Sequence, residues 1–195
     1  MRCDIVLAGV GGQGVLSLAA AIASGAMEEK LCVKQAEIHG MAQRGGAVMA
    51  TLRLADHEIA SDLIPRGTAL MILSMEPMES LRYLAYLSPQ GTLITSANPV
   101  RNIPDYPDLD ELLERIRSLP RAIIVDAEKL ARAAGSVRAT NMVMVGAAMH
   151  FLPIKAATIE AAVRAIFERK GDEVVDINLR ALRAGREAAH CPLYA

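Results

Sequence analysis

A glycine-rich turn that joins a short apolar run to an amphipathic segment most restricts what this 195-residue chain can fold into. Residues 3–8 (CDIVLA) resemble a buried parallel strand and end at the glycines of Gly9–Gly14 (GVGGQG). Apolar residues then follow the spacing of one helical face, at Val15, Leu18, Ala19 and Ile22. Strand, glycine turn and helix in this order are typical of a dinucleotide-type turn, which predicts an α/β fold.

The glycine turn by itself leaves two interpretations open. In a dinucleotide-type turn, glycines permit the bend, let a phosphate approach the backbone, and let helix and strand pack closely. Free N–H groups at the start of the helix then favour an anion. A lone GxGxxG also occurs as a purely structural tight turn, so phosphate binding and a structural role remain alternatives.

A second motif, Glu37–Gly46 (EIHGMAQRGG), follows a predicted strand over residues 31–38. It combines an acid, an imidazole, a carboxamide and a guanidinium with three glycines, and local folding does not require that density. The guanidinium of Arg44 is a rigid fork suited to carboxylate or phosphate. We expect this motif and the glycine turn to form one site.

Glu37 supports a competing interpretation. It lies close to where an acid binds the ribose in an NAD site, which favours an ordinary dinucleotide enzyme. The chain then runs into the glycine-containing motif rather than directly into a helix, which weakens that argument.

The rest of the chain predicts one domain over residues 1–195: a Rossmann-like, mainly parallel sheet flanked by helices, with additional C-terminal helices. Further strands are expected over residues 47–54, 69–73, 92–95 and 122–125. A helix should begin at Glu76–Pro77, a turn should occupy Pro89–Gly91, and Asp108 with Glu111 resembles a capping pair. The C-terminal helices are expected over residues 141–152, 158–169 and 176–189.

Two residues of the first C-terminal helix have predicted roles. Asn141 stands at the start of the helix, where capping is the default explanation, although it could instead point into the cleft at the strand ends. Gly146 costs about 1 kcal/mol relative to alanine in a helix, which indicates a close approach of another element.

Composition excludes several classes of function. Aromatic residues make up 3% and the net charge is −1, which argues against nucleic acid or an anionic membrane as the main partner. Cys3, Cys32 and Cys191 form no CxxC motif, so no zinc or iron–sulfur site is evident, and a reducing compartment is expected. No apolar run reaches the roughly 20 residues that cross a bilayer, so we expect a cytoplasmic protein. No residue set indicates a metal site or a catalytic triad.

Taken together, these motifs resemble the gamma-type subunit of 2-oxoacid:ferredoxin oxidoreductases, and most closely the small (beta) subunit of indolepyruvate:ferredoxin oxidoreductase. The resemblance is carried by Gly9–Val15, Glu37–Gly46, Glu76–Gly91 and Asn141–Gly146, and it covers about residues 3–185.

The resemblance implies a subunit of an enzyme that decarboxylates a 2-oxoacid on thiamine diphosphate, passes electrons through iron–sulfur clusters to ferredoxin, and releases an acyl-CoA. Thiamine diphosphate, Mg²⁺ and the clusters would belong to a larger partner subunit, and this chain would be inactive alone. It would contribute no catalytic residue, and its glycine turn could meet the pyrophosphate of coenzyme A. The candidate binding residues are Gly9, Gly11, Gly12, Gln13, Gly14, Glu37, His39, Gly40, Gln43, Arg44, Gly45, Gly46 and Asn141.

Other functions compete with this one. Within the family, the substrate could be pyruvate, 2-oxoisovalerate or 2-oxoglutarate. From other classes, the rivals are a stand-alone NAD(P)-dependent oxidoreductase and a nucleotide-sensing or purely structural module.

Overall fold

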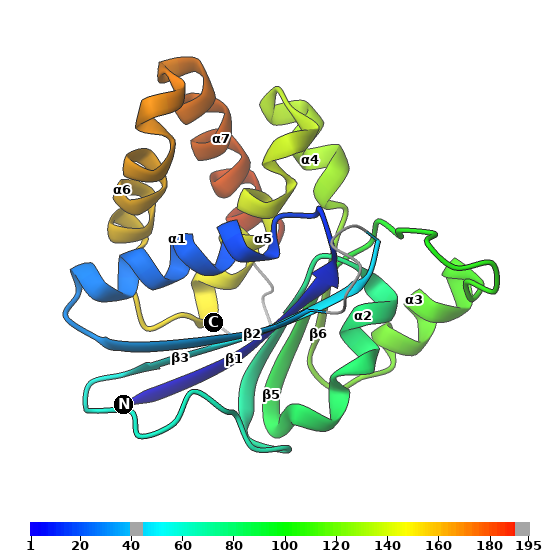
Figure 1. Cartoon of the computed structure of the whole chain (residues 1–195). Helices are drawn as coiled ribbons and strands as arrows, with labels where there is room; N and C mark the ends of the chain where they lie inside the picture. The colour runs from blue at the N-terminus through cyan, green and yellow to red at the C-terminus, as the bar shows by residue number, and fades with distance from the viewer. Residues whose placement is uncertain (40–44, 190–195) are drawn as a thin grey trace.

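The structure is a computed structural model that describes residues 1–39 and 45–189. Within these residues, six strands form one sheet in the order β2-β3-β1-β4-β5-β6 (Figure 1). The strands are β1 (Arg2–Val10), β2 (Cys32–His39), β3 (Ala47–Ala55), β4 (Ala69–Ser74), β5 (Leu87–Ser96) and β6 (Ala122–Val125). The pairings β1·β4, β4·β5 and β5·β6 are parallel. Only β3 runs against the others, so the mainly parallel sheet is confirmed.

Helices cover both faces of the sheet (Figure 1). One face carries α1 (Val15–Glu28), α4 (Ala127–Ala134), α5 (Thr140–Ala148), α6 (Ala156–Phe167) and α7 (Asp172–Ala188). The other face carries α2 (Pro77–Arg82) and α3 (Leu109–Arg117). Short 3₁₀ turns lie at η1 (Leu84–Tyr86), η2 (Val137–Ala139), η3 (Met149–Phe151) and η4 (Glu168–Lys170). The predicted C-terminal helices are therefore present.

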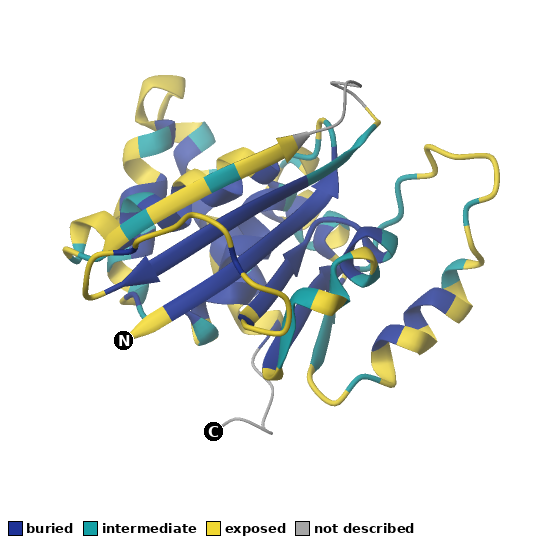
Figure 2. Ribbon diagram, turned by 60° about the horizontal axis from the view of Figure 1, so that its bottom comes forward, coloured by how far each residue is buried: buried dark blue, intermediate teal, exposed yellow. Residues whose placement is uncertain are grey.

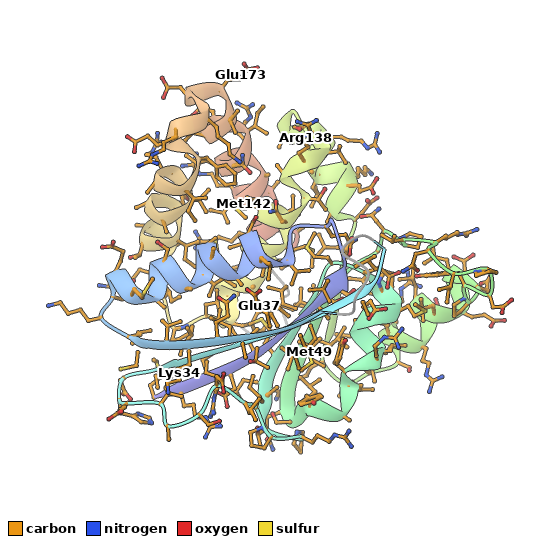
Figure 3. All side chains as sticks on the ribbon, in the orientation of Figure 1. Lys34, Glu37, Met49, Arg138, Met142 and Glu173 are labelled. Atoms are coloured by element: carbon orange, nitrogen blue, oxygen red, sulfur yellow. The ribbon has the colours of Figure 1, made fainter. Side chains whose placement is uncertain are left out.

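Successive apolar side chains of β1 point to opposite faces of the sheet and contribute to a hydrophobic core on each side. Ile5 and Leu7 join the larger core beneath α1 and α5, whereas Val6 joins the smaller core beneath α3. Met142 and Met49 mark the two cores in Figure 3. Figure 2 shows that the central strands are buried while β2, at the edge, is largely exposed. A strand with both faces buried reads as a continuous apolar run, which is why residues 3–8 were recognisable from the sequence.

The structure corrects two local predictions and adds one helix that was not predicted. The turn expected at Pro89–Gly91 lies inside β5, where the pairing to β4 shifts register between Ala69 and Met71. A Cβ at Gly91 would lie 2.8 Å from the Ala69 carbonyl oxygen, so this glycine permits a close strand contact rather than a turn. Apolar residues at Met78, Leu81, Leu84 and Leu87 predict a helix as far as Leu87, but α2 ends at Arg82 and the 3₁₀ turn η1 follows it. Helix α4 was not predicted at all; its N-cap is Asp126, which accepts a hydrogen bond from Lys129 N.

Two other local predictions are confirmed. Asp108 is the N-cap of α3 and accepts hydrogen bonds from the backbone N–H groups of Asp110 and Glu111. Gly146 lies at a close approach of α5 to α7, because a Cβ there would be 1.9 Å from the Leu182 carbonyl oxygen.

Candidate functional site

The glycine turn links the carboxyl end of β1 to the start of α1. Gly12 and Gly14 have φ values of 102° and 81°, which side chains rarely tolerate. Gly14 is the N-cap of α1 and offers no side chain to cover the first-turn N–H groups. Because an α-helix leaves its first N–H groups without intrahelical partners and concentrates positive partial charge there, this end of α1 is suited to an anion.

Gln13 braces the turn with both ends of its amide. Its Oε1 accepts a hydrogen bond from Val10 N at 2.8 Å, and its Nε2 donates to the Met75 carbonyl at 3.1 Å. A Cβ at Gly9 would lie 2.8 Å from a methyl group of Val15 and 3.1 Å from the Met75 Cβ. These contacts show that Gln13 and Gly9 hold the turn against the end of β4.

The described part of the second motif is bonded directly to the glycine turn. Gly11 N donates to the Gly46 carbonyl at 2.8 Å, and Gly45 N donates to the Gly11 carbonyl at 3.3 Å. Gly45 has a φ of 75°, which lets the chain turn into β3. The described end of the second motif thus adjoins the glycine turn, and that the two motifs form one binding site stays a prediction. The backbone of His39 ends β2, while Gly40, Gln43 and Arg44 lie outside the described residues.

Asn141 lies against the turn rather than capping its own helix. The N-cap of α5 is Ala139, which makes no side-chain cap. The Asn141 side chain is buried, and its Oδ1 accepts a hydrogen bond from the adjacent Met142 N at 3.0 Å. A Cβ at Gly14 would lie 3.0 Å from the Asn141 Nδ2. The default prediction of a cap was therefore wrong, and the Asn141 side chain lies against Gly14 instead. The alternative, that Asn141 points into a cleft at the strand ends, stays a prediction.

The topology separates Glu37 from the glycine turn. Glu37 pairs with Ala50 of β3, and Ala50 pairs with Leu7 of β1, so a whole strand lies between β2 and β1. Two strand spacings amount to about 10 Å. Glu37 is exposed at the sheet edge and accepts a hydrogen bond from Gln35 Nε2 at 2.7 Å (Figure 3). The described structure therefore gathers Gly9, Gly11, Gly12, Gln13, Gly14, Gly45, Gly46 and Asn141 but not Glu37.

Sequence reasoning missed three side chains beside the site. Glu76, which follows β4, is fully buried and accepts hydrogen bonds from Tyr106 Oη and, at 3.4 Å, from Val100 N. Burial, and then the bond to Glu76, raise the pKa of the Tyr106 hydroxyl. Asn102 Nδ2 donates to the Gly45 carbonyl. Two signals pointed to Glu76: its position at the carboxyl end of a predicted strand, where ligands bind in open α/β sheets, and its place at the start of the Glu76–Gly91 motif.

A metal centre requires several ligating side chains close together. Among residues 1–39 and 45–189, no three His, Cys, Asp or Glu side chains lie close enough to hold a metal ion. Cys3 is buried in the core, and burial raises the pKa of its thiol to about 12. No helix in the described residues combines the length and apolar character that a membrane span requires.

Comparison with known proteins identifies the class. Residues 4–188 match the family described as Pyruvate ferredoxin/flavodoxin oxidoreductase, and the chain belongs to this family.

Within the family, the chain is similar to proteins named Indolepyruvate oxidoreductase subunit IorB. The one from Archaeoglobus fulgidus is 39% identical over 97% of this chain and 96% of its own length. The one from Pyrococcus horikoshii is 36% identical over 95% of both chains. A 2-oxoglutarate synthase subunit KorC from Methanothermobacter thermautotrophicus is 30% identical over 96% of this chain and 95% of its own.

Solved structures share the fold. Pyruvate oxidoreductase subunit PORC from Thermotoga maritima matches with a TM-score of 0.74 and 24% identity, covering 95% of this chain and 96% of that one. A 2-oxoglutarate:ferredoxin oxidoreductase from Magnetococcus marinus, with 2-oxoglutarate, coenzyme A and succinyl-CoA bound, matches with a TM-score of 0.77 and 22% identity. That match covers 96% of this chain but 31% of the longer protein.

Proposed function

We propose that this chain is the small, non-thiamine subunit of a cytoplasmic 2-oxoacid:ferredoxin oxidoreductase whose substrate is indolepyruvate or another arylpyruvate. The observation that carries this proposal is the 39% identity to an indolepyruvate oxidoreductase subunit across nearly the full length of both chains. In the complex, a 2-oxoacid and coenzyme A give an acyl-CoA and CO₂, and two electrons pass to ferredoxin. The second candidate substrate is 2-oxoglutarate, supported by the 30% identity to a 2-oxoglutarate synthase subunit.

The partner is a larger subunit that holds thiamine diphosphate, Mg²⁺ and the iron–sulfur clusters. Bound there, thiamine diphosphate supplies the carbanion chemistry and the clusters carry the electrons. Two features of this chain support the division. It has three cysteines, whereas a cubane cluster takes four thiolates, and Cys3 is buried in the hydrophobic core. The role left for this chain is to bind and orient a substrate at the border of the partner's active site.

For that substrate we propose coenzyme A, with its pyrophosphate at the glycine turn. The support is electrostatic and steric. The first turn of α1 presents free N–H groups and positive partial charge. A Cβ at Gly12 would meet nothing within 4 Å, so the backbone there is open to a ligand. The candidate residues His39, Gly40, Gln43 and Arg44 stay in the proposal as coenzyme A-binding residues, with Arg44 as the phosphate ligand. Glu37 leaves the proposal, because β3 lies between it and the glycine turn.

Reconstitution with a thiamine-containing larger subunit tests the function. The isolated chain should not oxidise any 2-oxoacid, and the complex should reduce ferredoxin with indolepyruvate in a reaction that depends on coenzyme A. The specificity constant kcat/KM should be higher for indolepyruvate than for 2-oxoglutarate, pyruvate or 2-oxoisovalerate. Turnover by the isolated chain, or a preference for 2-oxoglutarate in the complex, would contradict the assignment.

The Gly12→Ala variant tests the coenzyme A site in the same complex. The φ of 102° at Gly12 strains any side chain, so the turn must shift. We expect the KM for coenzyme A to rise about five- to thirty-fold, corresponding to about 1–2 kcal/mol, with the KM for the 2-oxoacid unchanged. Gly25→Ala, near the far end of α1, is the matched control and should change neither constant. An unchanged KM for coenzyme A in Gly12→Ala would remove the ligand from the glycine turn.

A further inference from the structure

The loop between β5 and α3, residues 97–108, is fastened to a buried carboxylate. Glu76 is fully buried, and its Oε1 accepts hydrogen bonds from Val100 N and from the Tyr106 hydroxyl. Its Oε2 accepts a hydrogen bond from Glu79 N at 2.8 Å, at the start of α2. One carboxylate therefore holds two points of the loop and the N-terminus of a helix. A buried polar group that loses its hydrogen-bond partners costs free energy, so these bonds make Glu76 a firm anchor.

Asn102 lies between these two anchored points and reaches the second motif. Its backbone N–H donates to the Val100 carbonyl at 2.8 Å, which closes a tight turn. Its side-chain Nδ2 donates to the Gly45 carbonyl. On the other side, Gly45 N donates to the Gly11 carbonyl at 3.3 Å. The loop after β5 thereby holds the backbone that is paired with the glycine turn.

These contacts form a closed network of hydrogen bonds and chain connections that begins and ends at the glycine turn. Met75, next to Glu76, donates its N–H to the Ala8 carbonyl at 2.9 Å and accepts a hydrogen bond from Gln13 Nε2. In this network, Gln13 bonds to Met75, and the neighbouring Glu76 bonds to the loop at residues 100 and 106. Asn102 of that loop bonds to Gly45, which bonds to Gly11 of the glycine turn. Because each link joins a different segment of the chain, the relative position of the two motifs is fixed from two directions.

We propose that Asn102 and Tyr106 are positioning residues of the glycine-turn site. This inference rests on the proposed function, because it gives the residues a role in binding coenzyme A. A peptide group is planar and trans, so holding the Gly45 carbonyl also fixes the direction of the Gly46 N–H. Tyr106 acts one step further away, through Glu76, by fixing the loop that carries Asn102.

Two Asn102 variants in the reconstituted complex test the proposal. Asn102→Asp keeps the shape of the side chain but replaces the donor by a charged acceptor, and Asn102→Ala removes the group. Both should raise the KM for coenzyme A about three- to ten-fold, the effect of one hydrogen bond, with the KM for the 2-oxoacid and the kcat at saturating coenzyme A unchanged. Asn102→Gln retains the donor and should recover part of the loss. Asp105→Asn, an exposed residue of the same loop, is the control and should behave as the wild type.

Asn102 is exposed, so its variants should fold with an unchanged Tm. Tyr106→Phe should raise the KM for coenzyme A in the same direction and also lower the Tm, because Glu76 loses a donor. If Tyr106→Phe does not fold, the Asn102 variants alone test the positioning role.

The possible outcomes distinguish a failure of the positioning role from a failure of the proposed function. If Gly12→Ala raises the KM for coenzyme A and both Asn102 variants stay within twofold of the wild type, the positioning role is wrong and the binding site stands. If the Asn102 variants change kcat or the KM for the 2-oxoacid as much as that for coenzyme A, their role is general and the proposal fails. If the wild-type complex has no turnover that depends on coenzyme A, the proposed function fails first.

Discussion

At the scale of single residues, the structure shows roles that residue type alone does not reveal. Gln13 has the chemistry of a ligand, yet both ends of its amide are bonded within the protein. Cys3 could have been a reactive thiol, yet it is buried in β1 beside Asp4. Burial is the main cause that raises the pKa of Cys3 to about 12, from an ordinary value of 9.0, and the charge of Asp4 adds to it.

The Cys3 thiol should make the protein less stable at alkaline pH. The pKa of the thiol is raised in the folded state. Its contribution to the free energy of unfolding is therefore fully present below about pH 9, where the thiol is protonated in both the folded and the unfolded protein. Above that pH the unfolded thiol ionises first, and the contribution is lost progressively until pH reaches about 12. The free energy of unfolding should therefore fall by up to about 1.4 kcal/mol per pH unit from this group.

Urea unfolding at pH 8 and pH 10 measures this loss. Cys3→Ala should be less stable than the wild type at pH 8 but should lose less stability between the two pH values. Cys32→Ala is the control, because Cys32 is exposed, and it should lose as much as the wild type. Equal losses in the Cys3 variant and the wild type would show that the thiol does not titrate differently on folding.

At the scale of elements, glycines decide which helices can pack together. Gly146 of α5 faces α7, and Gly185 of α7 faces α5. A Cβ at either glycine would lie 1.9 Å from a backbone carbonyl oxygen of the opposite helix. Gly25 of α1 is different, because a Cβ there would make ordinary contacts of 3.4–3.5 Å with side chains of Ile159 and Ile154. The same substitution should therefore have opposite effects at positions that look alike in the sequence.

Gly146→Ala should destabilise the chain by roughly 2–4 kcal/mol, because two helix backbones must separate. For a chain of this length, the loss lowers the Tm by roughly 4–16 °C. Gly25→Ala should raise stability by up to about 1 kcal/mol, since alanine favours a helix over glycine. Thermal unfolding followed by circular dichroism compares the two. A Tm for Gly146→Ala at or above that of the wild type would contradict the close packing of α5 against α7.

At the scale of the whole molecule, strand order separates this fold from an ordinary dinucleotide-binding one. In a dinucleotide fold, the strand that carries the ribose-binding acid lies beside the glycine-turn strand. Here β3 occupies that place, and β2 with Glu37 is moved to the edge. A nucleotide at the glycine turn could not reach Glu37 across the intervening strand in the usual way.

The isolated chain should accordingly bind neither NADH nor NADPH with a Kd below the millimolar range. Fluorescence titration of the nicotinamide measures this, with a known Rossmann dehydrogenase as the positive control. Tight binding of either nucleotide would favour the stand-alone oxidoreductase that the sequence left open.

The sequence by itself determined the strand, glycine turn and helix at the N-terminus, the parallel strands and the C-terminal helices, because local periodicity and buried apolar runs depend on nearby residues. It also predicted that the two glycine-containing motifs form one site, and the bonds between Gly11, Gly45 and Gly46 place the end of the second motif beside the glycine turn. Only the tertiary structure decided that β3 separates Glu37 from the turn, that Pro89–Gly91 continues a strand, and that Asn141 lies against Gly14. Strand order and contacts between distant segments arise from packing across the whole chain, and no local pattern encodes them.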